Sequence, residues 1–216
     1  MNTYTVIDFE TTGLYAGIDR IIEVAAVRVC DGKIVGTFSE LMNPGFQIPS
    51  FITSLTGITN AMVRDRPRPE EMMPRLRAFL TDHICIAHNA SFDRRFLAAE
   101  MGFAGESHER RFLCSMLLSR RLVPEATSHK LGALAQHLRL ETPAGMQAHR
   151  ALADALLTVE LWKRLMADLR PHLHGREPDP ELVARISTKP KGSVASYLAS
   201  LSAKPIPRAA PGPPKA

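Results

Sequence analysis

The chain has 216 residues, 45% of them apolar, so it can bury one sizeable core with an appendage. It holds no apolar stretch of the ~18 residues that a membrane span needs, and its N-terminus has no signal-peptide pattern. Cys30, Cys85 and Cys114 are odd in number, widely spaced and without zinc-site spacing, which predicts reduced thiols of a cytoplasmic protein. The net charge of +5 is unevenly distributed: residues 1–170 hold 20 Lys and Arg against 19 Asp and Glu, whereas residues 171–216 hold 7 against 3. The part expected to fold is therefore near neutral, and charge alone does not argue for nucleic-acid binding.

The first third of the chain has the pattern of three strands. Hydrophobic runs predict them at residues 4–10, 21–30 and 33–42. The dipeptide Asp31-Gly32 strongly favours a two-residue hairpin, so the strands should form an antiparallel meander. The pattern then predicts a loop, a short helical turn ended by glycine and a helix, at residues 43–49, 53–59 and 70–80.

A short apolar strand and a series of helices follow. The strand is expected at residues 83–87, and Ser91 is a plausible N-cap for the next helix. Helical periodicity is found at residues 91–101, 111–122, 130–138 and 151–169. Strands followed by helices, with a strand–helix alternation in the middle, predict an α/β sandwich with a mixed sheet.

The composition changes at Pro171. Nine of the 16 prolines lie beyond Leu169, and the last residues cannot form a packed element. We therefore predict a folded domain over residues 1–170 and a basic, Pro-rich, loosely attached and partly disordered segment over residues 171–216. Two short amphipathic helices are expected within it, at residues 180–186 and 194–201.

Arginines cluster locally in the otherwise near-neutral part of the chain. Such clusters more often mark solvated helix faces than binding surfaces, although a local basic rim is the alternative. The clusters lie at residues 64–68, 94–95, 110–111 and 120–121.

The first strand carries two carboxylates in an apolar run, T-V-I-D-F-E-T-T-G-L. Asp8 and Glu10 lie two residues apart, so they share one face of the strand. Two carboxylates on a buried strand repel each other unless a cation lies between them, and oxygen ligands suit Mg²⁺ or Mn²⁺. The alternative is that one carboxylate lies at an exposed strand end.

Three later residues do not indicate a site when each is taken alone. Asp93 lies in the first turn of a predicted helix, where an acid stabilises the dipole by ~0.3–1 kcal/mol. Asp154 lies among apolar neighbours in H-R-A-L-A-D-A-L-L-T, where helix physics explains a carboxylate poorly. His149 precedes the same helix, and a lone histidine is usually a surface residue or one with its hydrogen bonds satisfied. Together with the first strand, however, they fit one chemistry. Two divalent ions ~4 Å apart can bind a scissile phosphate, while a histidine with a pKa of ~6.5 takes a proton from the attacking water.

The blocks D-F-E-T-T-G-L, H-N-A-S-F-D and H-R-A-L-A-D-A closely resemble the three motifs of the DEDDh exonucleases, which degrade nucleic acids from the 3′ end. The likeness runs from Thr5 to about Leu165 and is greatest to the proofreading epsilon subunit of bacterial DNA polymerase III and its stand-alone relatives. It implies an RNase H-like α/β fold: a five-stranded mixed sheet with helices on both faces. Histidine at position 149 argues against the sister subfamily that uses tyrosine there.

The resemblance also implies site residues. Asp8 would bridge two divalent ions, Mg²⁺ or Mn²⁺, with Glu10 and Asp154 completing one site, Asp93 acting through a water and His149 as the general base. Leu14 would be an apolar wedge against the last base, although core packing is the alternative for both Leu14 and Ile58. The expected contacts to the terminal nucleotide are Thr11, Thr12, Gly13, Leu14, Gly57, Ile58, His88 and Asn89.

The resulting hypothesis is a metal-dependent 3′–5′ exonuclease acting on single-stranded or frayed DNA 3′ ends. A second enzymatic reading assigns RNA, as in ribonuclease T or oligoribonuclease, because the sequence does not show how the pocket treats a 2′-hydroxyl. A third is that the chain serves mainly as an interaction subunit of a DNA polymerase catalytic subunit, docking through its tail after Pro171.

Overall fold

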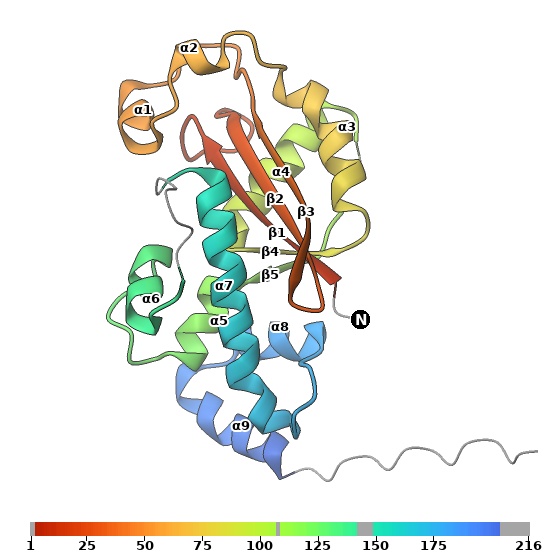
Figure 1. The fold of residues 1–216 in the computed structure, drawn as a ribbon, viewed down its shortest axis with the longest axis vertical. Helices are drawn as coiled ribbons and strands as arrows, with labels where there is room; N and C mark the ends of the chain where they lie inside the picture. The colour runs from red at the N-terminus through yellow and green to blue at the C-terminus, as the bar shows by residue number, and fades with distance from the viewer. Residues whose placement is uncertain (1–2, 107–108, 142–148, 204–216) are drawn as a thin grey trace, which may run out of the picture.

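The computed structural model describes residues 3–106, 109–141 and 149–203, which fold around one five-stranded sheet (Figure 1). The strand order is β3-β2-β1-β4-β5. β1, β2 and β3 are antiparallel, whereas β4 runs parallel to both β1 and β5. The predicted mixed sheet and its antiparallel meander are thus confirmed. The strands are β1 Thr3–Thr11, β2 Ile21–Cys30, β3 Lys33–Leu41, β4 Ile84–Ala87 and β5 Phe112–Cys114.

Helices cover both faces of the sheet. α7 crosses one face over β1 and β2, and α3 and α4 lie on the other (Figure 1). No helix in the described ranges is long and apolar enough to cross a membrane. The helices are α1 Ser50–Thr56, α2 Asn60–Val63, α3 Pro69–Leu80, α4 Ala90–Phe103, α5 Ser115–Leu122, α6 Leu131–Leu138, α7 Ala151–Leu169, α8 Pro180–Thr188 and α9 Val194–Ser202, with 3₁₀ turns η1 Arg170–Leu173 and η2 Lys191–Ser193.

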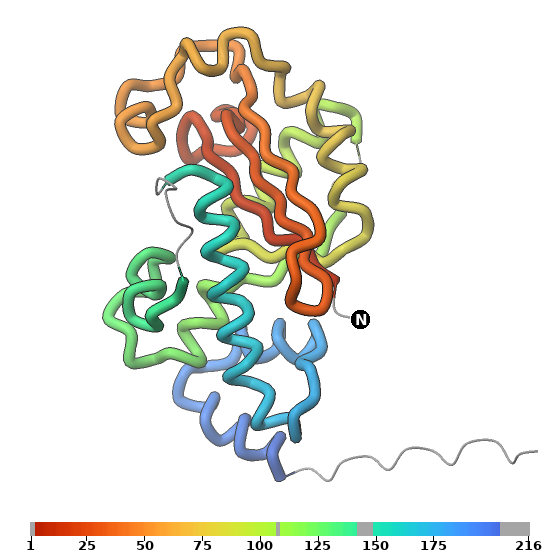
Figure 2. The backbone as a smooth tube through the Cα atoms, in the orientation of Figure 1, coloured from red at the N-terminus to blue at the C-terminus, as the bar shows by residue number. Residues whose placement is uncertain are grey.

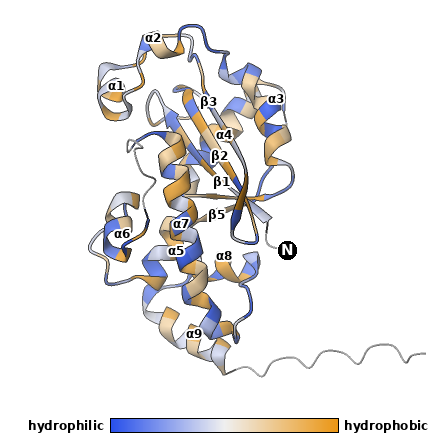
Figure 3. Cartoon of the chain, in the orientation of Figure 1, coloured by the Kyte–Doolittle hydropathy of each residue, from blue (hydrophilic) through white to orange (hydrophobic). Residues whose placement is uncertain are grey.

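The alternation of side chains on β1 decides which residues face α7. Val6 belongs to the buried cluster beneath α7, and Ile7 to the cluster beneath α3 and α4. Asp8 and Glu10 have the same parity as Val6, so the strand directs both carboxylates toward the α7 side. The apolar colouring of much of β2 and α7 in Figure 3 follows from burial between these layers.

Two local predictions are wrong. Residues 112–114 form β5 instead of the first turn of a helix, because Leu113 is buried where it pairs with Ile86 of β4. Helix α4 starts at Ala90, so its N-cap is Asn89 and not Ser91. Asn89 has φ 73°, in the left-handed region that asparagine tolerates better than most residues.

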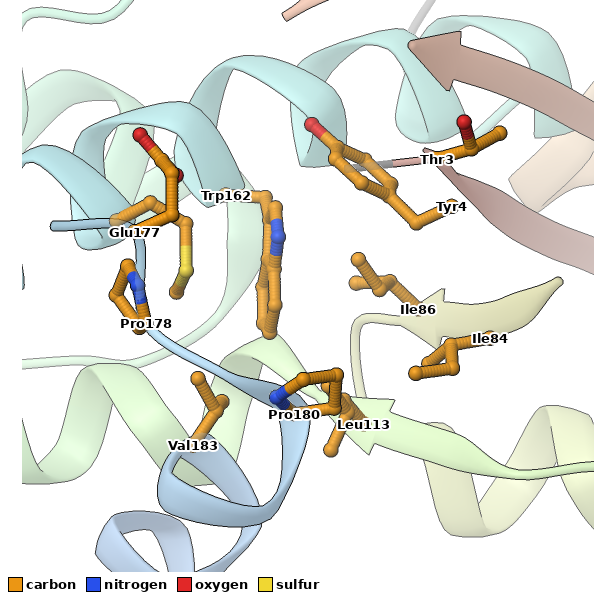
Figure 4. Close-up of a pocket in the computed structure, with 11 residues that line it drawn as sticks. Thr3, Tyr4, Ile84, Ile86, Leu113, Trp162, Glu177, Pro178, Pro180 and Val183 are labelled. Carbon is orange, nitrogen blue, oxygen red and sulfur yellow. The ribbon is translucent and has the colours of Figure 1, made fainter. Parts of the chain in front are cut away.

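The described part of the C-terminal segment packs on the core, which contradicts the prediction of loose attachment. α8 and α9 confirm the two predicted short helices. Figure 4 shows Trp162 of α7 between Tyr4 of β1 and Val183 of α8, around a cavity of about 80 Å³. The predicted disordered end, residues 204–216, lies outside the described residues. The segment's buried contributions to the core beneath α7 are Leu173, Leu182, Val183, Ile186, Val194 and Leu198.

Candidate active site

Three carboxylates meet near the end of β1. Asp8 and Glu10 come from alternate positions of the strand, and Asp154 comes from the first turn of α7. One oxygen of each carboxylate lies within 4.8 Å of the others, and all three residues are half-buried. The packing of α7 across β1 and β2 therefore joins residues that are far apart in the sequence.

Asp93 adds a fourth carboxylate from the first turn of α4 and is only 2% exposed. Its charge acts directly on Asp8. Burial raises the pKa of Asp8 well above its ordinary value, and the charges of Asp93, Asp154 and Glu10 raise it further. The four carboxylates thus form one electrostatic unit, although Asp93 is outside the closest group of three.

Among the described residues, no ion pair neutralises the acidic unit. Burial raises the pKa of Glu10 to about 8, helped by the charge of Asp154. Burial also raises the pKa of Asp93 to about 8, against hydrogen bonds from the backbone. None of the ion pairs found among the described residues involves these carboxylates, whose oxygens are a donor set suited to a hard divalent cation. The cluster can therefore hold such a cation.

His149 lies next to this unit, immediately before α7. Burial raises the pKa of the Asp154 carboxyl, whereas the charge and backbone of His149 lower it. His149 is exposed and has φ 59°, an uncommon conformation for a residue other than glycine. Its position beside Asp154 and its access to solvent are both compatible with the predicted proton transfer.

The sequence interpretation missed the ion pair that fixes the start of α7. Glu23, opposite Glu10 in the β1–β2 register, is 3% exposed. Its carboxylate accepts hydrogen bonds from Nη2 of Arg150 at 2.6 Å and from the Ala151 backbone N–H at 2.9 Å. The N-terminus of α7 has no side-chain cap of its own, so Glu23 supplies one from the sheet. The signal available in the sequence was an acid inside the apolar run I-I-E-V-A-A-V.

The loop after β1 is held by Asp19, which was also missed. The hydroxyl of Thr12 donates to Asp19 at 3.1 Å and accepts from the Arg20 N–H at 3.0 Å. A Cβ at Gly13 would lie 2.5 Å from the Asp19 carboxylate, so a larger residue here would displace the side chain that holds the loop. Leu14 is 69% exposed and therefore does not pack in the core. Figure 2 shows this loop, α1 and the start of α7 at the same end of the molecule.

The second predicted substrate loop follows α1. Gly57 is exposed and ends the helix in the left-handed conformation, at φ 74°. Ile58 is fully buried and packs with Ile22 and Ile52. The side chain of Ile58 thus serves the core, as the alternative interpretation expected, and only the backbone and Gly57 are left to face a ligand.

His88 joins the end of β4 to two other segments. Its Nδ1 lies 2.9 Å from the Ser115 hydroxyl and its Nε2 lies 2.9 Å from the backbone carbonyl of His129. Burial lowers the pKa of His88 to about 4, so the ring is neutral, with Nε2–H donating and Nδ1 accepting. Both ring nitrogens are therefore engaged within the protein, whereas the neighbouring Asn89 is exposed.

The raised pKa values predict a stability that depends on pH and on divalent cations. Glu10 and Asp93 have pKa values of about 8 against ordinary values of 4.5 and 3.8, so between these limits the folded state binds more protons than the unfolded chain. Stability without metal should therefore fall as pH rises through this window. A cation binds the ionised form, so Mn²⁺ should raise Tm more at pH 8.5 than at pH 5.5 in differential scanning fluorimetry. An equal shift at both pH values, measured at matched ionic strength, would contradict this.

The architecture is that of an α/β protein, a mixed sheet covered by helices, with an acidic cluster at the end of its first strand that could hold a cation. The model of the Exonuclease family (RNase T) matches residues 5–162. The chain belongs to this family, and its fold is the RNase H-like fold predicted from the motifs. It is thus a nuclease by family, and the resemblance identified from the three motifs is confirmed.

Relatives and solved structures agree with this assignment. DNA polymerase III subunit epsilon of Aquifex aeolicus is 36% identical over 168 residues, 77% of this chain and 82% of that protein. The PolC-type DNA polymerase III of Caldanaerobacter subterraneus subsp. tengcongensis is 38% identical over 167 residues, which are 77% of this chain but only 12% of the relative. A structure of Exonuclease X in complex with 5′ overhanging duplex DNA has a TM-score of 0.67 at 34% identity, covering 85% of this chain and 99% of that one.

Proposed function

We propose that the chain is a metal-dependent 3′–5′ exonuclease that hydrolyses the terminal phosphodiester of DNA and releases nucleoside 5′-monophosphates. The observation that carries the proposal is the convergence of Asp8, Glu10 and Asp154 within 4.8 Å. Asp93 and His149 lie beside this group. DNA as the substrate is supported by the likeness to the epsilon subunit and to the DNA complex of Exonuclease X.

In this proposal the carboxylates bind the cations and His149 transfers the proton. Asp8, Glu10, Asp93 and Asp154 hold two divalent cations, Mg²⁺ or Mn²⁺, which when bound lower the pKa of the attacking water and stabilise the leaving oxygen. His149, which lies beside Asp154, accepts the proton from that water.

The terminal nucleotide is proposed to lie between two loops. Thr11 at the end of β1, with Thr12 and Gly13 of the hydrogen-bonded loop that follows, contacts it through the backbone, while exposed Leu14 packs against the last base. The loop at Gly57 and Ile58 closes the other side through its backbone. His88 positions Asn89 for contact with the nucleotide, because its own ring nitrogens are engaged.

A 5′-labelled oligonucleotide tests polarity and product. With Mg²⁺ or Mn²⁺ the full-length chain should shorten a substrate with a free 3′-hydroxyl one nucleotide at a time and should leave a 3′-phosphorothioate-capped copy largely intact. Chromatography should identify nucleoside 5′-monophosphates. Absence of digestion with both metals between pH 6 and 9 would refute the proposal, and faster hydrolysis of a matched RNA would favour the exoribonuclease alternative.

The proposed partner, a DNA polymerase catalytic subunit, is supported by the names of the relatives. A truncation of residues 171–216 cannot test docking through the tail, because residues 171–203 supply part of the core and their loss would disturb the fold. The informative comparison is a pull-down with the full chain and with a chain lacking residues 204–216. Equal recovery of polymerase would reject docking through those last residues.

A further inference from the structure

A buried ion pair joins the start of β2 to helix α4. Arg20 immediately precedes β2, and Glu100 lies in the second half of α4 at 1% exposure. Nε of Arg20 donates to Oε1 of Glu100 and Nη2 donates to Oε2, both at 2.9 Å. The Ile21 backbone N–H donates to the same carboxylate at 3.2 Å. Glu100 therefore holds both the side chain of Arg20 and the first residue of β2.

Arg20 also closes the loop that follows β1. Its backbone N–H donates to the Thr12 hydroxyl at 3.0 Å, and its carbonyl accepts from the Thr12 N–H at 2.9 Å. Thr12 follows Thr11, the last residue of β1, which comes directly after Glu10. The pairing of Thr12 with Arg20 thus forms the base of the loop, and the bonds to Glu100 attach that base to α4.

The strand pairing is irregular where this loop begins. The β1–β2 register shifts between Glu10 and Thr11, which leaves Ile22 as an extra residue on β2. Such a bulge bends its strand and interrupts the regular ladder of hydrogen bonds. Glu100 supplies a fixed contact at this point, through the N–H of Ile21.

The geometry of the pair provides orientation as well as attachment. Burial removes water from both charged groups, so apolar residues would often join two elements at least as stably. A guanidinium that meets a carboxylate through two parallel hydrogen bonds, however, fixes the relative direction of the two groups. Nη2 of Arg20 also donates to Glu70 of α3, and the guanidinium carbon lies 5.2 Å from the ring centroid of Phe103. Arg20 is therefore held from α3 and from two places on α4.

We propose that Arg20 and Glu100 are positioning residues that hold the loop of Thr12 and Gly13 in the orientation needed to contact the terminal nucleotide. The inference rests on the proposed function and adds to it two residues that act through the loop without touching the substrate. Because the nucleotide contacts proposed for this loop are made by its backbone, they depend on where the base of the loop is held.

The pair should affect the nucleotide and leave the cations unaffected. Glu10 precedes the register shift and lies opposite Glu23 in the regular part of the ladder. Asp93 accepts a hydrogen bond from the Phe9 backbone, which ties it to β1 independently of Glu100. Loosening the loop should therefore weaken binding of the nucleotide while the cation ligands keep their places.

The test replaces Arg20 with Lys, which keeps the positive charge and removes the planar fork. Hydrogen exchange followed by NMR should show the Thr12 amide exchanging at least about tenfold faster. KM for a 3′-hydroxyl oligonucleotide should rise about tenfold, whereas kcat should change by less than about threefold. The Mg²⁺ concentration for half-maximal activity should stay the same. A purely structural role would instead lower Tm and the fraction of active protein without changing KM.

A second variant and a matched control complete the test. Glu100→Gln should also speed exchange at Thr12, and its effect should not add to that of Arg20→Lys, because both break one contact. Arg164→Lys removes the same fork from an exposed pair with Asp168 on α7 and should leave exchange and KM unchanged. Unchanged KM or unchanged Thr12 exchange in both Arg20→Lys and Glu100→Gln would overturn the proposal. Failure of the proposed function would look different: the unmodified chain would not digest the oligonucleotide, while the exchange rates would still show whether the pair holds the loop.

Discussion

Replacing Asp8 with Asn is expected to lower exonuclease turnover by at least about a thousandfold while the fold remains intact. Asp8 interacts with every other carboxylate of the site, because Asp93, Asp154 and Glu10 all raise its pKa. Asn has nearly the same shape and no charge, so the substitution removes a proposed cation ligand with little change in packing. Single-turnover digestion of a 3′-hydroxyl oligonucleotide measures the effect.

The stability of the same variant separates a functional role from a structural one. Asp8 is repelled by its neighbours, so Asp8→Asn should leave Tm without metal unchanged or slightly higher, and it should diminish the rise in Tm caused by Mn²⁺. Asp82→Asn, at an exposed position, is the control and should alter neither property. Activity above a tenth of the original in Asp8→Asn would show that Asp8 is not central to the reaction.

The part of the site that lies on one strand could be predicted from sequence alone. Asp8 and Glu10 share a face because strands alternate, and the α7-facing parity of Val6 bears this out. Asp93 and His149 each had an ordinary local explanation, so these residues and Asp154 indicated two-metal chemistry only when they were taken together with the first strand. The resemblance of their blocks to known motifs then gave each residue a role. The contact between α7 and β1 that brings Asp154 to Asp8 depends on tertiary packing, which no local sequence pattern predicts.

Other features escaped prediction for identifiable reasons. The three residues of β5 are too few to show the alternation of apolar and polar residues that marks a strand. They lead directly into α5, so the helical periodicity predicted a helix that included them. The Pro-rich composition after Pro171 suggested a detached segment, yet apolar residues such as Leu182 and Ile186 pack beneath α7. Composition averages over a segment, whereas packing depends on the few apolar side chains within it.

Replacing Arg150 with Leu is expected to lower the free energy of unfolding by about 2–3 kcal/mol. Glu23, at 3% exposure, would then have the Ala151 N–H at 2.9 Å as its one remaining partner among the described residues. Chemical denaturation measures the loss. Lys163→Leu breaks the more exposed pair with Glu160 on the same helix and, as the control, should cost no more than about 0.5 kcal/mol.

The same pair should also affect catalysis, because it fixes the helix end that carries Asp154. The charge of Arg150 lowers the pKa of Glu10, so Arg150→Leu should raise that pKa further and increase the Mg²⁺ concentration needed for half-maximal activity. Adding Glu23→Gln should recover part of the lost stability, since no buried charge would then lack a partner. The double variant should not recover turnover, because the tie between β2 and α7 would still be missing. If turnover and metal dependence were unchanged in Arg150→Leu, the pair would stabilise the fold without positioning the site.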